Sequence, residues 1–243
     1  MFQIPDMSKR LFVPELMDDT GCSEDELFCT LRQFKTLNGL FSRSRTLVKR
    51  YIIPHMKRCG NREIVCADIG AGGGDFALWF TRLCRAKGLR VKMLCIDHDP
   101  RIVRFARAAC LGRPDIAVLE GSAAAIDKIG IRIDYIFSNH FLHHVDTAEI
   151  PALINKMHSS ARCGFLINDL ARSRPAYAWF SLFCKIFFRT TMSFVDGRLS
   201  IRKGFTEREM ASFASQTSFA SSCIVGKLRP ARVYLCCLKN VSV

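Results

Sequence analysis

The chain has 243 residues, a formal net charge of +14 and a pI of about 9.5. Its apolar fraction of 49% and charged fraction of 24% are ordinary for a soluble globular domain with a substantial core. No segment reaches the roughly 18 uninterrupted apolar residues of a spanning helix, and the start lacks the features of a signal peptide. The basic charge fits an anionic partner, such as nucleic acid or a membrane surface, and equally a host with basic proteins.

Helical periodicity dominates the first part of the chain, from about residue 14 to residue 55. Ser23 is a plausible N-cap, because acidic residues fill the first turn that follows it. A second helical stretch covers about 44–56. We therefore expect an N-terminal helical cap over residues 1–58, followed by the main domain over residues 59–243.

Strands and helices then alternate strictly. The expected strands are 63–68, 90–97, 116–119, 134–138 and 163–168, and the expected helices are 76–87, 100–111 and 150–160. Continuous apolar runs such as Tyr135-Ile136-Phe137 are typical of parallel strands buried on both faces. The β-rich runs 222–228 and 233–239 predict an antiparallel hairpin. We predict an α/β fold: a doubly wound, mostly parallel seven-stranded sheet with that C-terminal antiparallel hairpin at its edge.

The twelve cysteines are scattered and include no CxxC pair, which argues against a zinc knuckle or a thioredoxin-like motif. Cys66 and Cys95 lie inside apolar runs, where a thiol behaves as a small buried hydrophobe. Free thiols predict a reducing, cytoplasmic location.

A glycine loop lies where the first strand should pass into a helix, and 68–75 reads Asp-Ile-Gly-Ala-Gly-Gly-Gly-Asp. Glycine allows a tight turn and lets the backbone approach a ligand closely. A dinucleotide fingerprint would need its third glycine at position 75, which is Asp75. The carboxylate of Asp68 would also repel a pyrophosphate. The loop therefore favours a ligand that carries positive charge.

An acid followed by spaced glycines resembles the first motif of the class I S-adenosylmethionine (SAM)-dependent methyltransferases, and the order of elements over about 63–239 is similar to theirs. The resemblance implies that SAM is the cofactor, with Asp68 near its amino group and Asp97 on its ribose hydroxyls. His98 would lie along the adenine. Ser122 stands where many relatives carry an acid, which is a departure from the pattern. The complete set of expected cofactor-binding residues is Asp68, Gly70, Ala71, Gly72, Gly74, Asp97, His98, Ser122 and Asn139.

Three of the six histidines follow the fourth strand, at His140, His143 and His144. Open α/β sheets bind ligands at this end of their strands. The run 142–146 looks like the segment of small-molecule O-methyltransferases whose histidine removes the acceptor proton. The resemblance implies that role for His143, or for His144 after a shift of one residue. No cysteine or carboxylate pattern supports a metal at these histidines, and we expect none.

The predicted activity is transfer of a methyl group from SAM to a small acceptor, a hydroxylated aromatic or a quinone- or polyketide-like molecule. Asp169 and Arg172 could orient this acceptor, and an aromatic insertion at about 172–205 could form a lid over it or simply pack as a helix. Contact with a membrane surface is a third reading of the insertion. The alternatives are an RNA methyltransferase, although no RNA-binding module is recognisable, and a SAM-binding protein without turnover.

Overall fold

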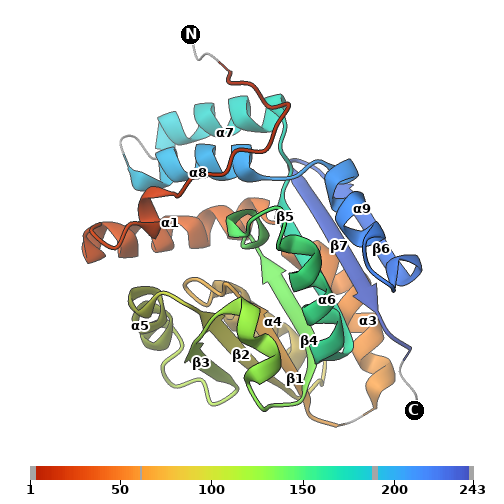
Figure 1. Ribbon diagram of the computed structural model, residues 1–243. Coiled ribbons are helices and arrows are strands. Elements are labelled where there is room, and N and C mark those ends of the chain that lie inside the picture. The colour runs from red at the N-terminus through yellow and green to blue at the C-terminus, as the bar shows by residue number, and fades with distance from the viewer. Residues whose placement is uncertain (1–3, 61, 188–190, 241–243) are drawn as a thin grey trace.

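The structure is a computed structural model that describes residues 4–60, 62–187 and 191–240 (Figure 1). Its strands are β1 (Ile64–Ile69), β2 (Val91–Asp97), β3 (Ile116–Glu120), β4 (Ile133–Asn139), β5 (Ala161–Leu170), β6 (Cys223–Leu228) and β7 (Arg232–Leu238). They form a seven-stranded sheet in the order β3-β2-β1-β4-β5-β7-β6. The first five strands pair in parallel, and β7 pairs antiparallel with both β5 and β6. The predicted fold class and the C-terminal hairpin are confirmed.

Helices cover both faces of this sheet, because the strand side chains alternate between two cores. One core joins the strands to α6 (Ile150–Ser160) and α9 (Glu207–Ser215). The other joins them to α4 (Asp75–Ala86) and to the helical segment made of α2 (Ser44–Leu47), the π-helical η2 (Val48–Ile52) and α3 (Ile53–Met56). Helix α5 (Pro100–Ala109) contacts β2 and β3.

A layer of three helices lies beyond the carboxyl end of β4, above the sheet in Figure 1. These are α1 (Glu24–Phe41), α7 (Arg174–Phe187) and α8 (Met192–Lys203), and α8 contacts both of the others. The expected N-cap of α1 is confirmed, since Ser23 Oγ accepts a hydrogen bond from the Glu26 N–H at 3.4 Å. The helical layer places residues from both ends of the sequence over the edge where ligands bind in such sheets.

The N-terminal segment before α1 is tied to this layer by backbone contacts. The Leu11 N–H donates to the Arg202 carbonyl at 3.1 Å. The Leu16 and Met17 N–H groups donate to the carboxylate of Asp196 at 2.8 and 3.0 Å. Residues of the segment therefore reach the upper edge of the sheet, next to the short helix η5 (Leu142–His144).

Arg172 and helix α9 differ from what the sequence predicts. Arg172 was expected to orient an acceptor, but its side chain donates to the carbonyls of Met7 and Gly204 and to Glu209, so it joins the N-terminal segment to α9. Helix α9 was not predicted, although Thr206 and Glu209 form the capping box that marks such a start.

All twelve cysteines are free, and none of the described helices has the length and apolar character to cross a membrane. The insertion at 172–205 forms α7 and α8, with residues 188–190 lying outside the described residues. The division into 1–58 and 59–243 stays a prediction.

Candidate active site

A cavity lies between the carboxyl edge of the sheet and the helical layer above it. The predicted residues that line it are Asp68, Gly70, Ala71, Gly72, Asp97, His98, Asn139, His143 and His144. Side chains from α1, α7 and α8 line the opposite side, among them Phe41, Trp179 and Ser200. One cavity thus contains the glycine loop and the histidine segment, which lie far apart in the sequence.

The glycine loop is fixed to the neighbouring strand by its own backbone. The N–H groups of Gly70 and Ala71 both donate to the Ile96 carbonyl, at 2.9 and 3.1 Å. Gly70 has φ of +65°, and a Cβ at this position would come within 2.2 Å of the Phe141 ring. Glycine is therefore required here for two reasons, its backbone conformation and the close approach of an aromatic side chain.

Asp97 ends β2 beside this loop, and its carboxylate is held by two backbone N–H groups. Gly72 donates to Oδ2 at 3.0 Å, and Asp99 donates to Oδ1 at 3.3 Å. His98 is next to it, with Nδ1 3.7 Å from the Asp97 carboxylate and a side chain that is 75% exposed. The geometry presents one buried carboxylate and one exposed ring at the rim of the cavity.

Three carboxylates surround the loop, and their negative charge is little compensated. Burial raises the pKa of Asp68 well above its usual value, and the charges of Asp75 and Asp97 raise it further. Burial also raises the pKa of Asp97, and it raises that of Asp75 to about 6. Among the described residues, no lysine or arginine forms an ion pair with any of the three. Such a cluster fits a cationic ligand and opposes an anionic one.

His143 is buried and tightly held on one side by Asp169. Its Nδ1 lies 2.7 Å from Asp169 Oδ1, and its backbone N–H donates to Asp169 Oδ2 at 3.2 Å. Burial alone would raise the pKa of Asp169, but the charge and hydrogen bond of His143 outweigh it and lower that pKa. An ionised Asp169 accepts a hydrogen bond from the Nδ1–H of His143, which leaves the lone pair on Nε2 available.

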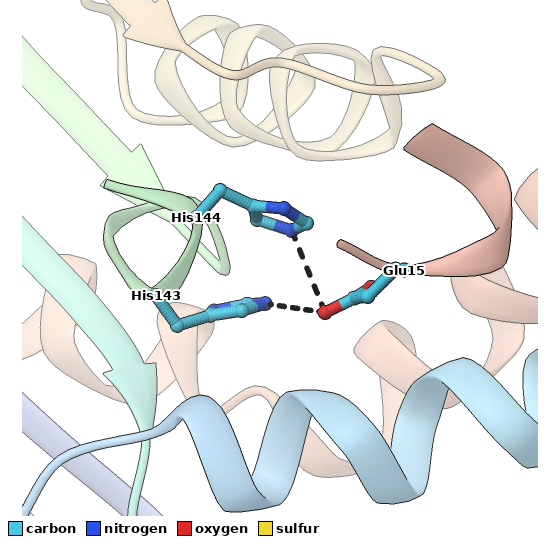
Figure 2. A group of neighbouring side chains, drawn as sticks. All are labelled: Glu15, His143 and His144. Carbon is cyan, nitrogen blue, oxygen red and sulfur yellow. Dashed lines mark ion pairs between the residues drawn. The ribbon is translucent and has the colours of Figure 1, made fainter. Parts of the chain in front are cut away.

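His143 and His144 both face Glu15, as Figure 2 shows. The distances from Glu15 Oε1 are 3.6 Å to His143 Nε2 and 3.9 Å to His144 Nε2. Burial lowers the pKa of His144, but the hydrogen bond to Asp18 and the negative charges of Glu15 and Asp18 together outweigh burial, so the net shift is upward. The same contact lowers the pKa of Asp18 to about 2, against a burial effect that would raise it. His144 thus belongs to an ion pair with the N-terminal segment.

Glu15, His143 and His144 could in principle bind a metal, since their ligand atoms lie within 4.8 Å of one another. A buried ammonium already occupies this neighbourhood, however. Lys203 Nζ lies 3.1 Å from Glu15 Oε1 and 3.4 Å from His144 Nδ1. A divalent ion next to this ammonium would be strongly repelled. We therefore infer that Lys203 is the cation of this cluster and that no metal binds there.

Residues 66–164 match a family model described as a methyltransferase domain. Over these residues, which make up less than half of the chain, the sequence is similar to a methyltransferase domain. The match begins in β1 and ends in β5, so it includes the glycine loop, Asp97 and the histidine segment. No curated protein matches the sequence significantly.

Solved structures share the methyltransferase fold at low sequence identity. Human N-acetylserotonin methyltransferase in complex with SAM is 15% identical with a TM-score of 0.62, covering 90% of this chain. This chain spans only 57% of the length of the human protein. A SAM-dependent methyltransferase from Aquifex aeolicus is 16% identical with a TM-score of 0.56, covering 87% of this chain and 97% of its own. Plantazolicin methyltransferase, solved with S-adenosylhomocysteine (SAH), is 13% identical with a TM-score of 0.57. The match covers 90% of this chain and 98% of that protein.

Two of the predicted cofactor residues have local structural contacts instead of lining the cavity. Gly74 is the N-cap of α4 with φ of +75°, and a Cβ there would lie 3.1 Å from Cys110 Sγ. Ser122 is exposed, and its Oγ accepts a hydrogen bond from the Ala124 N–H at 3.2 Å, which caps a 3-10 helix. Cofactor contacts by these two residues stay predictions.

Sequence reasoning missed several charged residues that line or adjoin the cavity, among them Glu15, Asp18, Lys203 and Arg232. The position of Arg232 could have been found, because it begins β7 beside Leu170, where the parallel strand β5 ends. Glu15 and Lys203 carry no motif. They come together only because the N-terminal segment packs on α8.

Proposed function

We propose that this methyltransferase transfers a methyl group from SAM to an oxygen of a small hydroxylated aromatic or quinone- or polyketide-like acceptor. The observation that carries the proposal is His143, which is held at Nδ1 by Asp169 and lines the same cavity as the glycine loop. Human N-acetylserotonin methyltransferase and plantazolicin methyltransferase share the fold and are named for small-molecule acceptors. These likenesses support a small acceptor for this chain.

SAM fits the carboxylate side of the cavity. Its ammonium and sulfonium charges would relieve the repulsion among Asp68, Asp75 and Asp97, which burial otherwise leaves unfavourable. In our proposal Asp68 and Asn139 bind the amino group, and Asp97 accepts the ribose hydroxyls beside His98. Gly72 has no heavy atom within 4 Å of an added Cβ, so its backbone borders open space that the methionine part can fill.

The acceptor side is apolar and aromatic. Phe41 of α1 meets Trp179 of α7 edge to face, with ring centroids 4.8 Å apart. Trp79, Trp179 and Phe180 also line the cavity. Flat aromatic molecules bind well between such rings, and this supports the reading of α7 as part of a lid.

In the proposed mechanism, bound SAM supplies an activated methyl group together with its thioether leaving group. His143 Nε2 would accept the proton of the acceptor hydroxyl. Asp169 stabilises the imidazolium that results and keeps the ring in the correct tautomer. The aromatic residues of α1 and α7 align the acceptor and exclude water.

SAM binding should release protons at mildly acidic pH. The free protein binds a proton at Asp75 below a pH of about 6, and the positive ligand favours the ionised carboxylate. SAM affinity should therefore fall as the pH is lowered from about 7.5 to about 5. Calorimetry in two buffers of different ionisation enthalpy measures the protons released. SAH lacks the sulfonium charge and should release fewer. Proton uptake on SAM binding would contradict this assignment.

Methyl transfer itself should be detected by incubating the purified protein with isotope-labelled SAM and fractions of phenolic and quinone extracts. Mass spectrometry should show label in a small molecule. A tRNA sample belongs in the same panel, because the net charge of +14 makes RNA the alternative acceptor. Label in the RNA alone would replace the proposed function. Binding of SAM without label in any sample would indicate a protein without turnover.

A further inference from the structure

A second imidazole, His140, lines the cavity between the two halves of the site. Its backbone has φ of +55°, a left-handed conformation that is costly for any residue with a Cβ. Its N–H is held by the Asn168 carbonyl at 3.0 Å. Strained backbone of this kind persists where the surrounding structure enforces it, and such residues cluster in functional sites.

The tautomer of His140 is fixed by Arg232. Arg232 Nη1 donates to His140 Nδ1 at 2.8 Å. Arginine has no acceptor to offer, so Nδ1 must be the unprotonated nitrogen and Nε2 must carry the hydrogen. His140 Nε2 is buried and has no hydrogen-bond partner among the described residues. The site thus holds a buried N–H donor that lacks an acceptor, which is unfavourable unless a ligand supplies one.

Arg232 is itself a buried cation on the cavity wall, with only 6% of its surface exposed. Its two hydrogen-bond partners are neutral, His140 Nδ1 and the Phe41 carbonyl, which accepts from Nε at 2.9 Å. No carboxylate of the described residues forms an ion pair with it. Burial lowers the pKa of Arg232 to about 9, partly offset by attraction to Asp169. Asp169 is already hydrogen-bonded to His143, so the guanidinium charge is poorly compensated.

The position of Arg232 and His140 favours contact with the acceptor over contact with the cofactor. Arg232 begins β7 and pairs with Leu170 at the end of β5. The acidic residues proposed for SAM lie on β1 and β2, on the other side of β4 in the sheet. His140 follows β4 directly. The unpaired donor and the uncompensated cation therefore lie on the same side of the sheet centre as the His143–Asp169 pair.

We propose that Arg232 and His140 form a subsite for a carboxylate of the methyl acceptor, so that the natural substrate is a hydroxylated aromatic acid or an acidic polyketide. The carboxylate would accept hydrogen bonds from Arg232 and from His140 Nε2, and it would compensate the buried charge. Charge-assisted pairs of this kind are among the strongest in proteins. The proposal rests on the proposed function, because it takes this half of the cavity as the acceptor site.

The test uses matched pairs of aromatic acids and their neutral amides with one, two and three rings, starting with 4-hydroxybenzoate and 4-hydroxybenzamide. The two tryptophans of the chain, Trp79 and Trp179, both line the cavity, so intrinsic fluorescence reports binding without turnover. With SAH bound at saturation, the wild-type protein should bind at least one acid ~10- to 100-fold more tightly than its amide. Equal affinity, or no binding of any acid, overturns the proposal.

Substitutions identify the residues that cause the preference for the acid over its amide. Arg232→Met should abolish the preference for the acid, and Arg232→Lys should keep part of it. Arg45 also lines the cavity but is exposed, so Arg45→Met removes the same charge as a matched control and should keep the preference. Loss of the preference in Arg45→Met but not in Arg232→Met overturns the assignment. If Arg232→Met does not fold, the wild-type comparison of acid and amide still decides the proposal.

SAH affinity of the same variants separates the two possible sources of a carboxylate. It should change less than about twofold in Arg232→Met. A loss of SAH affinity as large as the loss of acid affinity would place the cofactor carboxylate at Arg232 and overturn the proposal. Acid preference in a protein that methylates nothing would leave the subsite intact and refute only the proposed function.

Discussion

His143→Ala should lower the rate of methyl transfer by ~10²- to 10⁴-fold, the usual contribution of a well-placed general base. SAH affinity should stay nearly unchanged, because the contacts of His143 run to Asp169 and Glu15 and not to the glycine loop. Single-turnover measurements with labelled SAM give the rate, and calorimetry gives the affinity.

His144→Ala is the matched control for this prediction. His144 is the neighbouring residue, and its ring faces Asp18 and Lys203 of the segments that cover the site. We expect a smaller loss of rate, together with a lower stability of the N-terminal segment. If His144→Ala causes the larger loss of rate, the base is His144. Full activity of both variants would show that neither histidine accepts the proton.

The sheet could be predicted from the sequence because its information is local. Buried parallel strands need unbroken apolar runs, such as Tyr135-Ile136-Phe137, and the strands of this chain alternate with amphipathic helices. The glycine loop was equally readable. Only glycine tolerates both φ of +65° and the Phe141 ring at position 70, so the constraint is visible in the residue itself.

The covering side of the site was not predictable by the same reasoning. Glu15 accepts a hydrogen bond from Ser200 at 2.8 Å, a contact between residues 185 positions apart. Nothing in the local sequence around either residue indicates the other. Lys203 looks like an ordinary basic residue at a helix end, yet it is buried against Glu15. Such residues are identified by tertiary packing, which the periodicity of the sequence does not encode.

Asp169, the hydrogen-bond partner of His143, was predicted as a site residue but with a different contact. Asp169 was expected to contact the acceptor because it leaves β5 at the ligand-binding edge. The structure brings it to the imidazole, since β5 lies next to β4 and η5 follows β4. Both oxygens of Asp169 accept N–H groups only: His143 Nδ1 and Leu170 N on Oδ1, and His143 N on Oδ2.

Asp169→Asn should therefore reduce methyl transfer by ~10²- to 10⁴-fold while the side chain keeps its shape. The amide must turn its NH₂ group toward N–H donors at one of the two oxygen positions. If the NH₂ faces His143 Nδ1, the imidazole proton moves to Nε2 and the base is lost. If it faces the backbone, a buried donor is left without an acceptor, at a cost of ~1–3 kcal/mol in the free energy of unfolding.

The measurements separate these effects. A large fall in kcat with unchanged SAH affinity would indicate the wrong tautomer. A fall in the unfolding temperature with a smaller loss of kcat would indicate an unpaired backbone N–H. Asp169→Glu, which keeps the charge, should restore part of kcat if the carboxylate acts through His143. Full activity of Asp169→Asn would contradict any role of Asp169 in positioning His143, and the acceptor proton would then have to leave by another route.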